Sequence, residues 1–142
     1  YVTFETAKKL KEKGFDKSCM NAINRFGCTY ANGWCEYLDD RAGEFITQGD
    51  LKERDYLLPT ISQTLKWLRE ERNFHVSPDL VSDYSVDADD NICEEWTYWS
   101  YSIHHIIDGI LYRDYNQFDH IESKSYEEAA IAGIEYVLDN LI

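Results

Sequence analysis

Residues 96–111 of the chain, WTYWSYSIHHIIDGIL, contain the pattern that decides the fold. Toward residue 103, large side chains recur at every second position, which is the period of a β-strand. We therefore predict a strand with two different faces. Its core face holds Trp99, Tyr101 and Ile103, and its other face holds Trp96, Tyr98, Ser100 and Ser102.

Two dipeptides predict tight turns between paired strands. Asp108-Gly109 lies between pairs of aliphatic residues, and we expect the return strand to run to about Tyr115. Asn32-Gly33 lies in the middle of residues 28–38, whose aromatic and other β-prone side chains favour a second hairpin. A further strand is predicted to start at residues 74–76.

Three segments have the end signals and the spacing of helices. Residues 3–13 predict a short amphipathic helix that ends at Gly14. A second helix is predicted to start at Thr60, which can form a capping box with Gln63, and a third follows a similar box at residues 125–128. The predicted buried positions are Ile61, Leu65 and Leu68, with Trp67 beside them, in the second helix, and Ala129, Ala130, Ile134, Val137, Leu138 and Leu141 in the third.

Together these elements predict an α+β fold: an antiparallel β-sheet built from hairpins, with about three helices packed on one face. A length of 142 residues suits a single domain over residues 1–142. We expect the other face of the sheet to be partly wet, with Tyr30, Trp96 and Tyr98 on it. The polar, acidic stretch from Asp39 to Tyr56 is expected to be exposed.

The chain is strongly acidic, because 14 Lys and Arg against 27 Asp and Glu give a net charge of -13. A hydrophobic content of 44% is too high for a disordered acidic tail. The negative field disfavours direct binding of nucleic acid and of anionic membranes, since both depend on Lys and Arg. No apolar run is long enough to cross a bilayer, and the four cysteines form no Cys-x-x-Cys pair, so we expect a soluble cytoplasmic protein with reduced thiols.

Three blocks of sequence look familiar together. They are FETAKKLKEKGFD at residues 4–16, Pro59-Thr60 followed by KWLRE at residues 66–70, and SYEEA at residues 125–129. Together they resemble a family of small uncharacterised proteins carried by phages and prophages of gut Bacteroidetes, and the central block is the specific one. The resemblance implies a viral accessory protein that works in the cytoplasm of a bacterial host. It implies no catalytic residues.

The most acidic stretch, residues 79–95, is predicted to be a loop or an irregular hairpin tip. From the charge and the resemblance we expect a non-enzymatic protein whose acidic surface binds and inhibits a basic host factor that itself binds nucleic acid. An anti-defence role that mimics nucleic acid, such as inhibition of a CRISPR nuclease, fits this expectation by analogy. The predicted partner-binding residues are Asp83, Asp87, Asp89, Asp90, Glu94 and Glu95, with Asp39 and Asp40 as a second patch.

A second hypothesis is a small-molecule binding protein that sequesters a nucleotide signal between aromatic and cationic side chains. Such a protein would favour a homo-oligomer that builds the pocket, and the sequence leaves the oligomeric state open. The predicted pocket residues are Lys66, Trp67, Arg69, Trp96 and Tyr98.

A metal-dependent nuclease is a third hypothesis, for which no residues indicate a site. His104 and His105 are adjacent on a predicted strand, so they face opposite sides and do not form a simple metal pair. Residues 87–91 have the oxygen spacing of a calcium loop, but Ile92 replaces the required glycine and Tyr98 replaces the final glutamate. We therefore predict no catalytic residue, no metal ligand and no cofactor.

Overall fold

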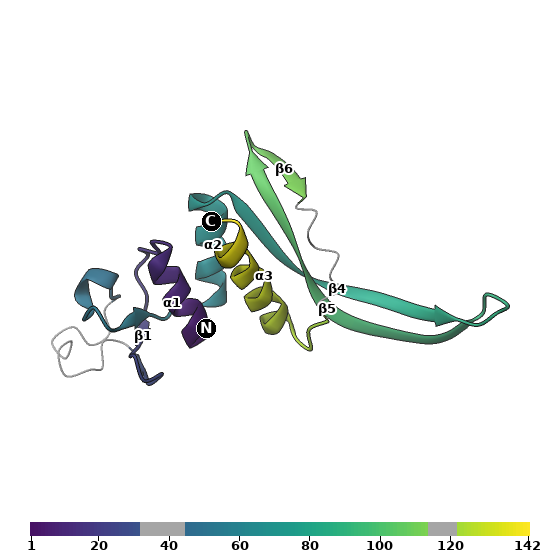
Figure 1. Cartoon of the computed structure of the whole chain (residues 1–142), viewed down its shortest axis with the longest axis horizontal. Helices are drawn as coiled ribbons and strands as arrows, with labels where there is room; N and C mark the ends of the chain where they lie inside the picture. The colour runs from purple at the N-terminus through teal and green to yellow at the C-terminus, as the bar shows by residue number, and fades with distance from the viewer. Residues whose placement is uncertain (32–44, 114–121) are drawn as a thin grey trace.

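The computed structural model describes residues 1–31, 45–113 and 122–142. Within these ranges the chain forms three α-helices and two three-stranded antiparallel sheets, which confirms the predicted α+β class (Figure 1). The strands of one sheet follow the order β2-β1-β3, and those of the other follow the order β4-β5-β6. The elements are α1 (Phe4–Glu12), β1 (Asn21–Ile23), β2 (Thr29–Ala31), β3 (Tyr56–Leu57), α2 (Ile61–Glu71), β4 (Phe74–Val86), β5 (Ile92–Ile107), β6 (Ile110–Arg113) and α3 (Tyr126–Asn140).

The second and third helices begin at the caps that the sequence predicts, and the first has a cap of the same kind at Thr3. The side-chain hydroxyls of Thr3, Thr60 and Ser125 each accept a hydrogen bond at 3.1 Å from the backbone N–H three residues further on. Each bond satisfies one of the donors that a helix start leaves unpaired. Just after α1, Gly14 adopts a φ of 80°, which favours glycine, and so ends the helix as predicted. Within the described ranges, no helix has the length and apolar character needed to span a membrane.

The main core lies between α3 and the base of the long β4–β5 hairpin. Ile134 of α3 and Ile103 of β5 are fully buried there. A Cβ atom at Gly133 would lie only 2.6 Å from Cγ1 of Val76, so the backbone of α3 lies directly against the hairpin. Five of the six predicted core residues of α3 are buried and Leu141 is half-buried, which confirms the predicted apolar face.

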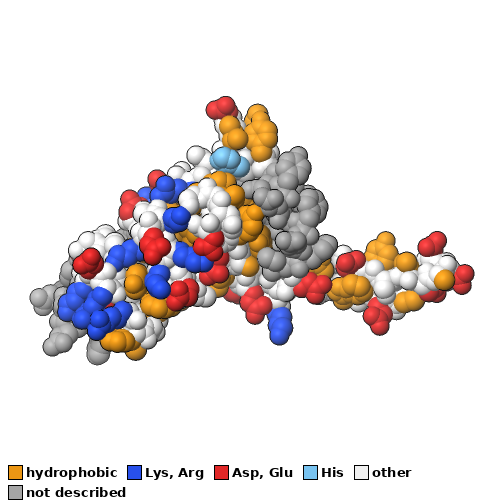
Figure 2. Space-filling view, in the orientation of Figure 1, with side chains coloured by type: hydrophobic (Ala, Val, Ile, Leu, Met, Phe, Trp, Pro, Cys, Tyr) orange, Lys and Arg blue, Asp and Glu red, His pale blue; other side chains and the backbone are white. Residues whose placement is uncertain are grey.

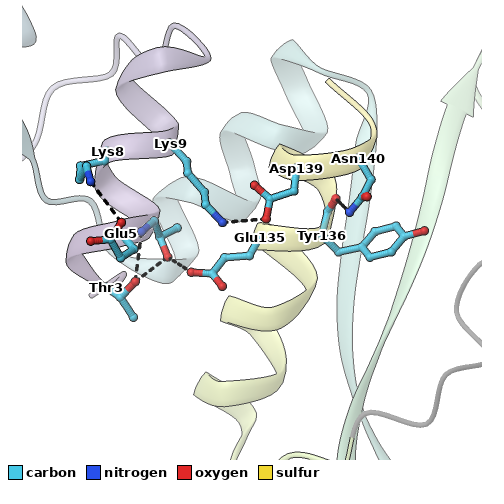
Figure 3. A network of polar contacts seen from close by, with 9 residues as sticks. Thr3, Glu5, Lys8, Lys9, Glu135, Tyr136, Asp139 and Asn140 are labelled. Atoms are coloured by element: carbon cyan, nitrogen blue, oxygen red, sulfur yellow. Dashed lines mark hydrogen bonds and ion pairs between the residues drawn. The ribbon is translucent and has the colours of Figure 1, made fainter.

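Polar contacts join α1 to α3 (Figure 3). Thr6 is fully buried, and its hydroxyl donates a hydrogen bond to Glu135 at 2.7 Å. Lys9 forms an ion pair with Asp139 at 2.7 Å on the exposed side of the same interface. The buried side chains of α1, including Leu10, belong to the same core as those of α3. The first helix is therefore part of the body of the molecule.

The small sheet contains a hairpin that the sequence did not predict. Strands β1 and β2 pair in the register Ala22 with Tyr30, and the side chain of Asn24 closes their turn by accepting hydrogen bonds from the N–H groups of Phe26 and Cys28. The predicted turn at Asn32-Gly33 lies outside the described residues.

The expected exposure of the stretch from Asp39 to Tyr56 holds for part of its described residues, including Lys52, Glu53 and Arg54, and is wrong for three others. Ile46 is fully buried and forms an antiparallel bridge with Cys19, and Leu51 and Asp55 are buried as well. The sequence did not reveal this burial, because the stretch is polar in composition and its bridge is to Cys19, a distant residue in the chain.

The β4–β5 hairpin is longer and more regular than predicted. The stretch from 79 to 95 was expected to be a loop or an irregular tip, but β4 and β5 pair without interruption from Phe74 opposite His105 to Ser85 opposite Glu94. One register shift follows, between Ser85 and Val86, and only residues 87–91 form the tip. β-prone residues such as Val81 and Tyr84 favour strand structure in spite of the acidic side chains between them.

The second predicted hairpin turn is confirmed. Asp108 and Gly109 both have positive φ, at 50° and 78°, and Ile107 pairs with Ile110, as expected for a two-residue turn. The predicted core face of β5 is confirmed at Ile103, which is fully buried, whereas Trp99 and Tyr101 are half-buried. The other face is not uniformly wet, because Tyr98 is only 9% exposed.

Trp67 belongs to the core, and the prediction that it lies beside the buried face of its helix is wrong. The side chain is 3% exposed and meets the ring of Phe15 edge-on at a centroid distance of 5.4 Å. The guanidinium of Arg72, the C-cap residue of α2, lies over the same ring at 5.0 Å from its centroid. Contacts from a distant segment thus cover a position that helical spacing alone places at the margin.

Candidate functional site

The outer part of the β4–β5 hairpin extends away from the body as a two-stranded ribbon (Figures 1 and 2). We call residues 79–98 the arm. The arm begins next to an isolated bridge in which Trp99 of β5 exchanges hydrogen bonds with Ser123 at 3.0 and 2.8 Å. The eight residues from Asp79 to Val86 correspond to a length of roughly 26 Å at about 3.3 Å per residue. Along the arm, β4 and β5 pair with each other.

The tip of the arm is organised by one carboxylate. Oδ1 of Asp87 accepts hydrogen bonds from the backbone N–H groups of Asp89 and Asn91, at 2.8 and 3.0 Å. The backbone bond from Asn91, followed by that from Asp89, lowers the pKa of Asp87 below its ordinary value. Asp90 adopts a φ of 61° in the same turn. Asp87 therefore shapes the arm, in addition to contributing charge.

The arm has a concentrated negative charge without internal compensation. The chain has no Lys or Arg between Arg72 and Arg113, so the arm carries a formal charge of -7. Asp79 accepts hydrogen bonds from Ser77 and Ser102, and Asp83 accepts one from the backbone N–H of Tyr84. The remaining carboxylates of the arm make no hydrogen bond or ion pair with any described residue; they are Asp89, Asp90, Glu94 and Glu95.

An apolar stripe runs along one face of the arm. Glu95 shares this face, whereas the alternation of side chains places Asp79, Asp83 and Glu94 on the other face. Leu80, Tyr84 and Val86 have the same parity as the buried Val76, so the stripe continues the core face of β4 beyond the helices. Ile92 lies opposite Val86. Leu80 is 60% exposed and Ile92 is 64% exposed. Several large apolar side chains exposed along one face, with polar residues between them, are typical of an interaction site.

The structure brings the main predicted partner-binding residues together. Asp83, Asp87 and the four unpartnered carboxylates all lie on the arm, whereas Asp39 and Asp40 lie outside the described residues. The apolar stripe was missed by the sequence interpretation. The alternation of Leu80, Ser82, Tyr84 and Val86 is a strand signal that could have revealed it.

The residues of the predicted nucleotide pocket do not meet in one place. Lys66 and Trp67 line a surface hollow of about 350 Å³, together with Lys17 and other residues near α2. Tyr98 lines a different hollow, of about 340 Å³, at the base of the arm, whose described lining also includes Leu80, Thr97, Trp99, Glu122, Ser123 and Lys124. Trp96 lies further out, opposite Asp83, and Arg69 is exposed on α2.

The histidines of the long hairpin lie beside aromatic rings on the neighbouring strand. His105 stacks on Phe74 at a centroid distance of 4.5 Å, and the rings of His75 and His104 are 6.4 Å apart on the opposite face. Across residues 1–31, 45–113 and 122–142, no group of three or more His, Cys, Asp or Glu side chains is arranged to hold a metal ion. His120 lies outside these ranges.

The arm therefore combines a shaped acidic tip, four unpartnered carboxylates and an exposed continuation of the core face. A search of family models, of curated proteins and of solved structures found no match to this chain.

Proposed function

We propose that this chain is a non-catalytic interaction protein whose acidic arm binds a basic partner protein and blocks the partner's own binding surface. The observation that carries the proposal is the arm itself, with a charge of -7, no Lys or Arg, and an exposed apolar stripe. Solubility alone requires a modest net charge and no apolar surface of this kind. The combination favours a binding role.

The two kinds of surface on the arm have different tasks. The unpartnered carboxylates attract a basic surface over a distance and raise the association rate at low salt. The apolar stripe, from Leu80 to Ile92, adds affinity once the partner covers it, because burial of apolar area is favourable. Such a site would act rapidly at low ionic strength and would still hold its partner through contacts that salt does not screen.

A nucleic-acid-binding protein is the partner class that suits the arm. Proteins that bind nucleic acid present Lys and Arg to phosphates, and carboxylates accept charge-assisted hydrogen bonds from the same groups. Together with the resemblance of the sequence to phage proteins, this supports a viral accessory protein in a bacterial cytoplasm. In this proposal the protein occupies the nucleic-acid site of a host factor, such as a defence nuclease.

The proposal is tested with two variants of matched charge. The arm variant carries Asp89→Asn, Asp90→Asn and Glu94→Gln. The body variant carries Glu12→Gln, Glu53→Gln and Asp108→Asn; these side chains are also exposed and make no hydrogen bond or ion pair with a described residue. A basic protein captured from host lysate at low salt is purified, and its Kd is measured against both variants and the unaltered chain over a series of salt concentrations.

We expect the arm variant to weaken binding by about tenfold or more at low salt and to flatten the salt dependence, since fewer charges face the partner. The body variant should change the Kd by less than about twofold, because its charges lie away from the interface. An equal loss of affinity in the two variants would show that binding depends on the net charge alone. Unchanged binding by the arm variant would show that the arm is not the site.

A further inference from the structure

The backbone of β5 offers an unpaired edge on the arm. Trp99 directs its backbone N–H and C=O outward, away from β4, where they bond to Ser123 at 3.0 and 2.8 Å. In a strand, backbone groups of every second residue point to the same edge. Thr97 and Glu95 therefore point their backbone groups along the same edge as Trp99.

These groups have no partner among the residues that the structure describes. Strand β6 pairs with β5 only from His104 to Ile107, and Ser123 pairs only with Trp99. The ladder along this edge thus stops at Trp99, and Thr97 and Glu95 present free donors and acceptors beyond it. An exposed edge of this kind is a template for another strand.

The opposite edge of the arm, formed by β4, offers fewer free N–H groups to an added strand. Pro78 of β4 lies opposite Tyr101 and has no N–H to donate. Further out, the N–H of Tyr84 is already bonded to the carboxylate of Asp83 at 2.8 Å. The edge of β4 is therefore interrupted at two of its outward positions, whereas the edge of β5 is open at Thr97 and Glu95.

We infer that an extended, basic segment of the partner adds to this edge of β5 as a further strand, continuing the ladder that Ser123 begins. The inference rests on the proposed function and names its binding mode. Main-chain hydrogen bonds supply affinity in strand addition, and alternate side chains supply selectivity. A strand beside β5 places one side chain next to Glu95 and the neighbouring one next to Trp96, on the other face. The segment that fits alternates cationic and apolar residues.

A second copy of this chain does not fit the edge. Pairing of two arms would bring together seven carboxylates from each copy without a single Lys or Arg. Like charges on adjacent strands are destabilising. The charge of the arm therefore selects a basic segment over self-association.

The edge is tested with two proline variants of the full chain. Ser82 and Thr97 lie directly opposite each other, and both direct their N–H outward, so Thr97→Pro and Ser82→Pro remove one outward donor each from the two edges. The probe is a synthetic, end-capped peptide of alternating lysine and valine, and its Kd is measured by fluorescence anisotropy at low salt. We expect Thr97→Pro to weaken binding by about tenfold and Ser82→Pro to weaken it much less.

Because proline can disturb the arm itself, a second measurement uses the unaltered protein. Amide hydrogen exchange is followed by NMR with and without the peptide. We expect the amides of Glu95 and Thr97 to become protected, and those of Leu80 and Ser82 to keep their exchange rates. A peptide whose lysines are methylated on the backbone nitrogen keeps its positive charge but lacks the N–H groups that extend the ladder. It should bind about tenfold more weakly.

The outcomes separate this inference from the proposed function. If binding depends on the arm carboxylates but Glu95 and Thr97 gain no protection, strand addition to β5 is wrong while the acidic arm remains the site. Protection of Leu80 and Ser82 instead would place the partner on β4 and overturn the inference. If the peptide binds the arm variant as tightly as the unaltered chain, the proposed function fails as well.

Discussion

Asp87 helps to hold the turn at the tip of the arm, because its carboxylate oxygen Oδ1 accepts hydrogen bonds from the backbone N–H groups of Asn91 and Asp89. These bonds place the pKa of the folded carboxyl below the ordinary value of 3.8. A carboxyl group with a depressed pKa stabilises the folded form above its ordinary pKa, and the contribution is lost as the pH falls through the folded value. The turn should therefore loosen only in acid below pH 3.8.

Removal of this oxygen should loosen the tip at neutral pH as well. We expect Asp87→Ala to speed amide hydrogen exchange at Asn91 by several-fold, and Asp87→Asn to have a smaller effect because asparagine keeps an acceptor oxygen. NMR exchange rates at neutral pH measure the difference. Asp89→Ala is the control, since the side chain of Asp89 has no partner among the described residues. An equal effect of Asp89→Ala would mean that charge, and not the Asp87 bonds, orders the turn.

At the scale of elements, the contact between α3 and the long hairpin depends on Gly133. Alanine is the better helix former by about 1 kcal/mol, but its Cβ would lie 2.6 Å from Val76 and 3.1 Å from the ring of Tyr101. We expect Gly133→Ala to lower the free energy of unfolding by about 1–3 kcal/mol, because overpacking forces the hairpin away from the helix. Urea denaturation gives the value.

A double-mutant cycle identifies the cause. Val76→Ala leaves a cavity and should cost about 0.5–3 kcal/mol alone, but in the Gly133→Ala background the new methyl group occupies part of that space. The double variant should therefore be more stable than the sum of the two single losses predicts. Strict additivity would show that the helix and the hairpin do not meet at this point.

Local signals predicted the elements well, and long-range contacts account for what they missed. Thr60 with Gln63, and Asp108 with Gly109, act within a few residues, so the sequence alone indicates their cap and turn. The burial of Trp67 depends on Phe15, which is distant in the chain. The long pairing of β4 with β5 adds up over many residue pairs, and an acidic composition hides it.

The candidate site was predicted in part for the same reason. Charge is visible in composition, so the acidic residues of the arm were found from sequence. Exposure of Leu80 and Tyr84 was not found, because alternating apolar residues normally face a core. Only the three-dimensional arrangement shows that the helices do not extend over this part of the sheet (Figure 1).

At the scale of the whole molecule, the arm carries -7 of the total -13 and leaves -6 for the rest of the chain. Net charge of one sign destabilises a compact state through self-repulsion, and salt screens that repulsion. We therefore expect the free energy of unfolding at pH 7 to rise by up to about 2 kcal/mol between low salt and about 0.5 M sodium chloride. Urea denaturation at several salt concentrations measures this rise.

A control at lower pH isolates the electrostatic part of the effect. Near the sequence pI of about 4.6 the net charge approaches zero, so the salt effect should nearly vanish there. A rise of equal size at both pH values would instead indicate a general effect of salt on apolar burial. A fall in stability with salt at pH 7 would mean that attractive ion pairs, such as Lys9 with Asp139, outweigh the repulsion.

The absence of Lys and Arg between Arg72 and Arg113 also decides how proteases cut the chain. Trypsin cleaves after Lys and Arg, so it leaves the whole arm, with β6, on one fragment from Asn73 to Arg113. A glutamate-specific protease has Glu94 and Glu95 as its only sites in that fragment, and both lie on the arm. Trypsin therefore leaves the arm joined to the base of its hairpin and to β6, and the glutamate-specific protease cuts that fragment only beside the open edge of β5.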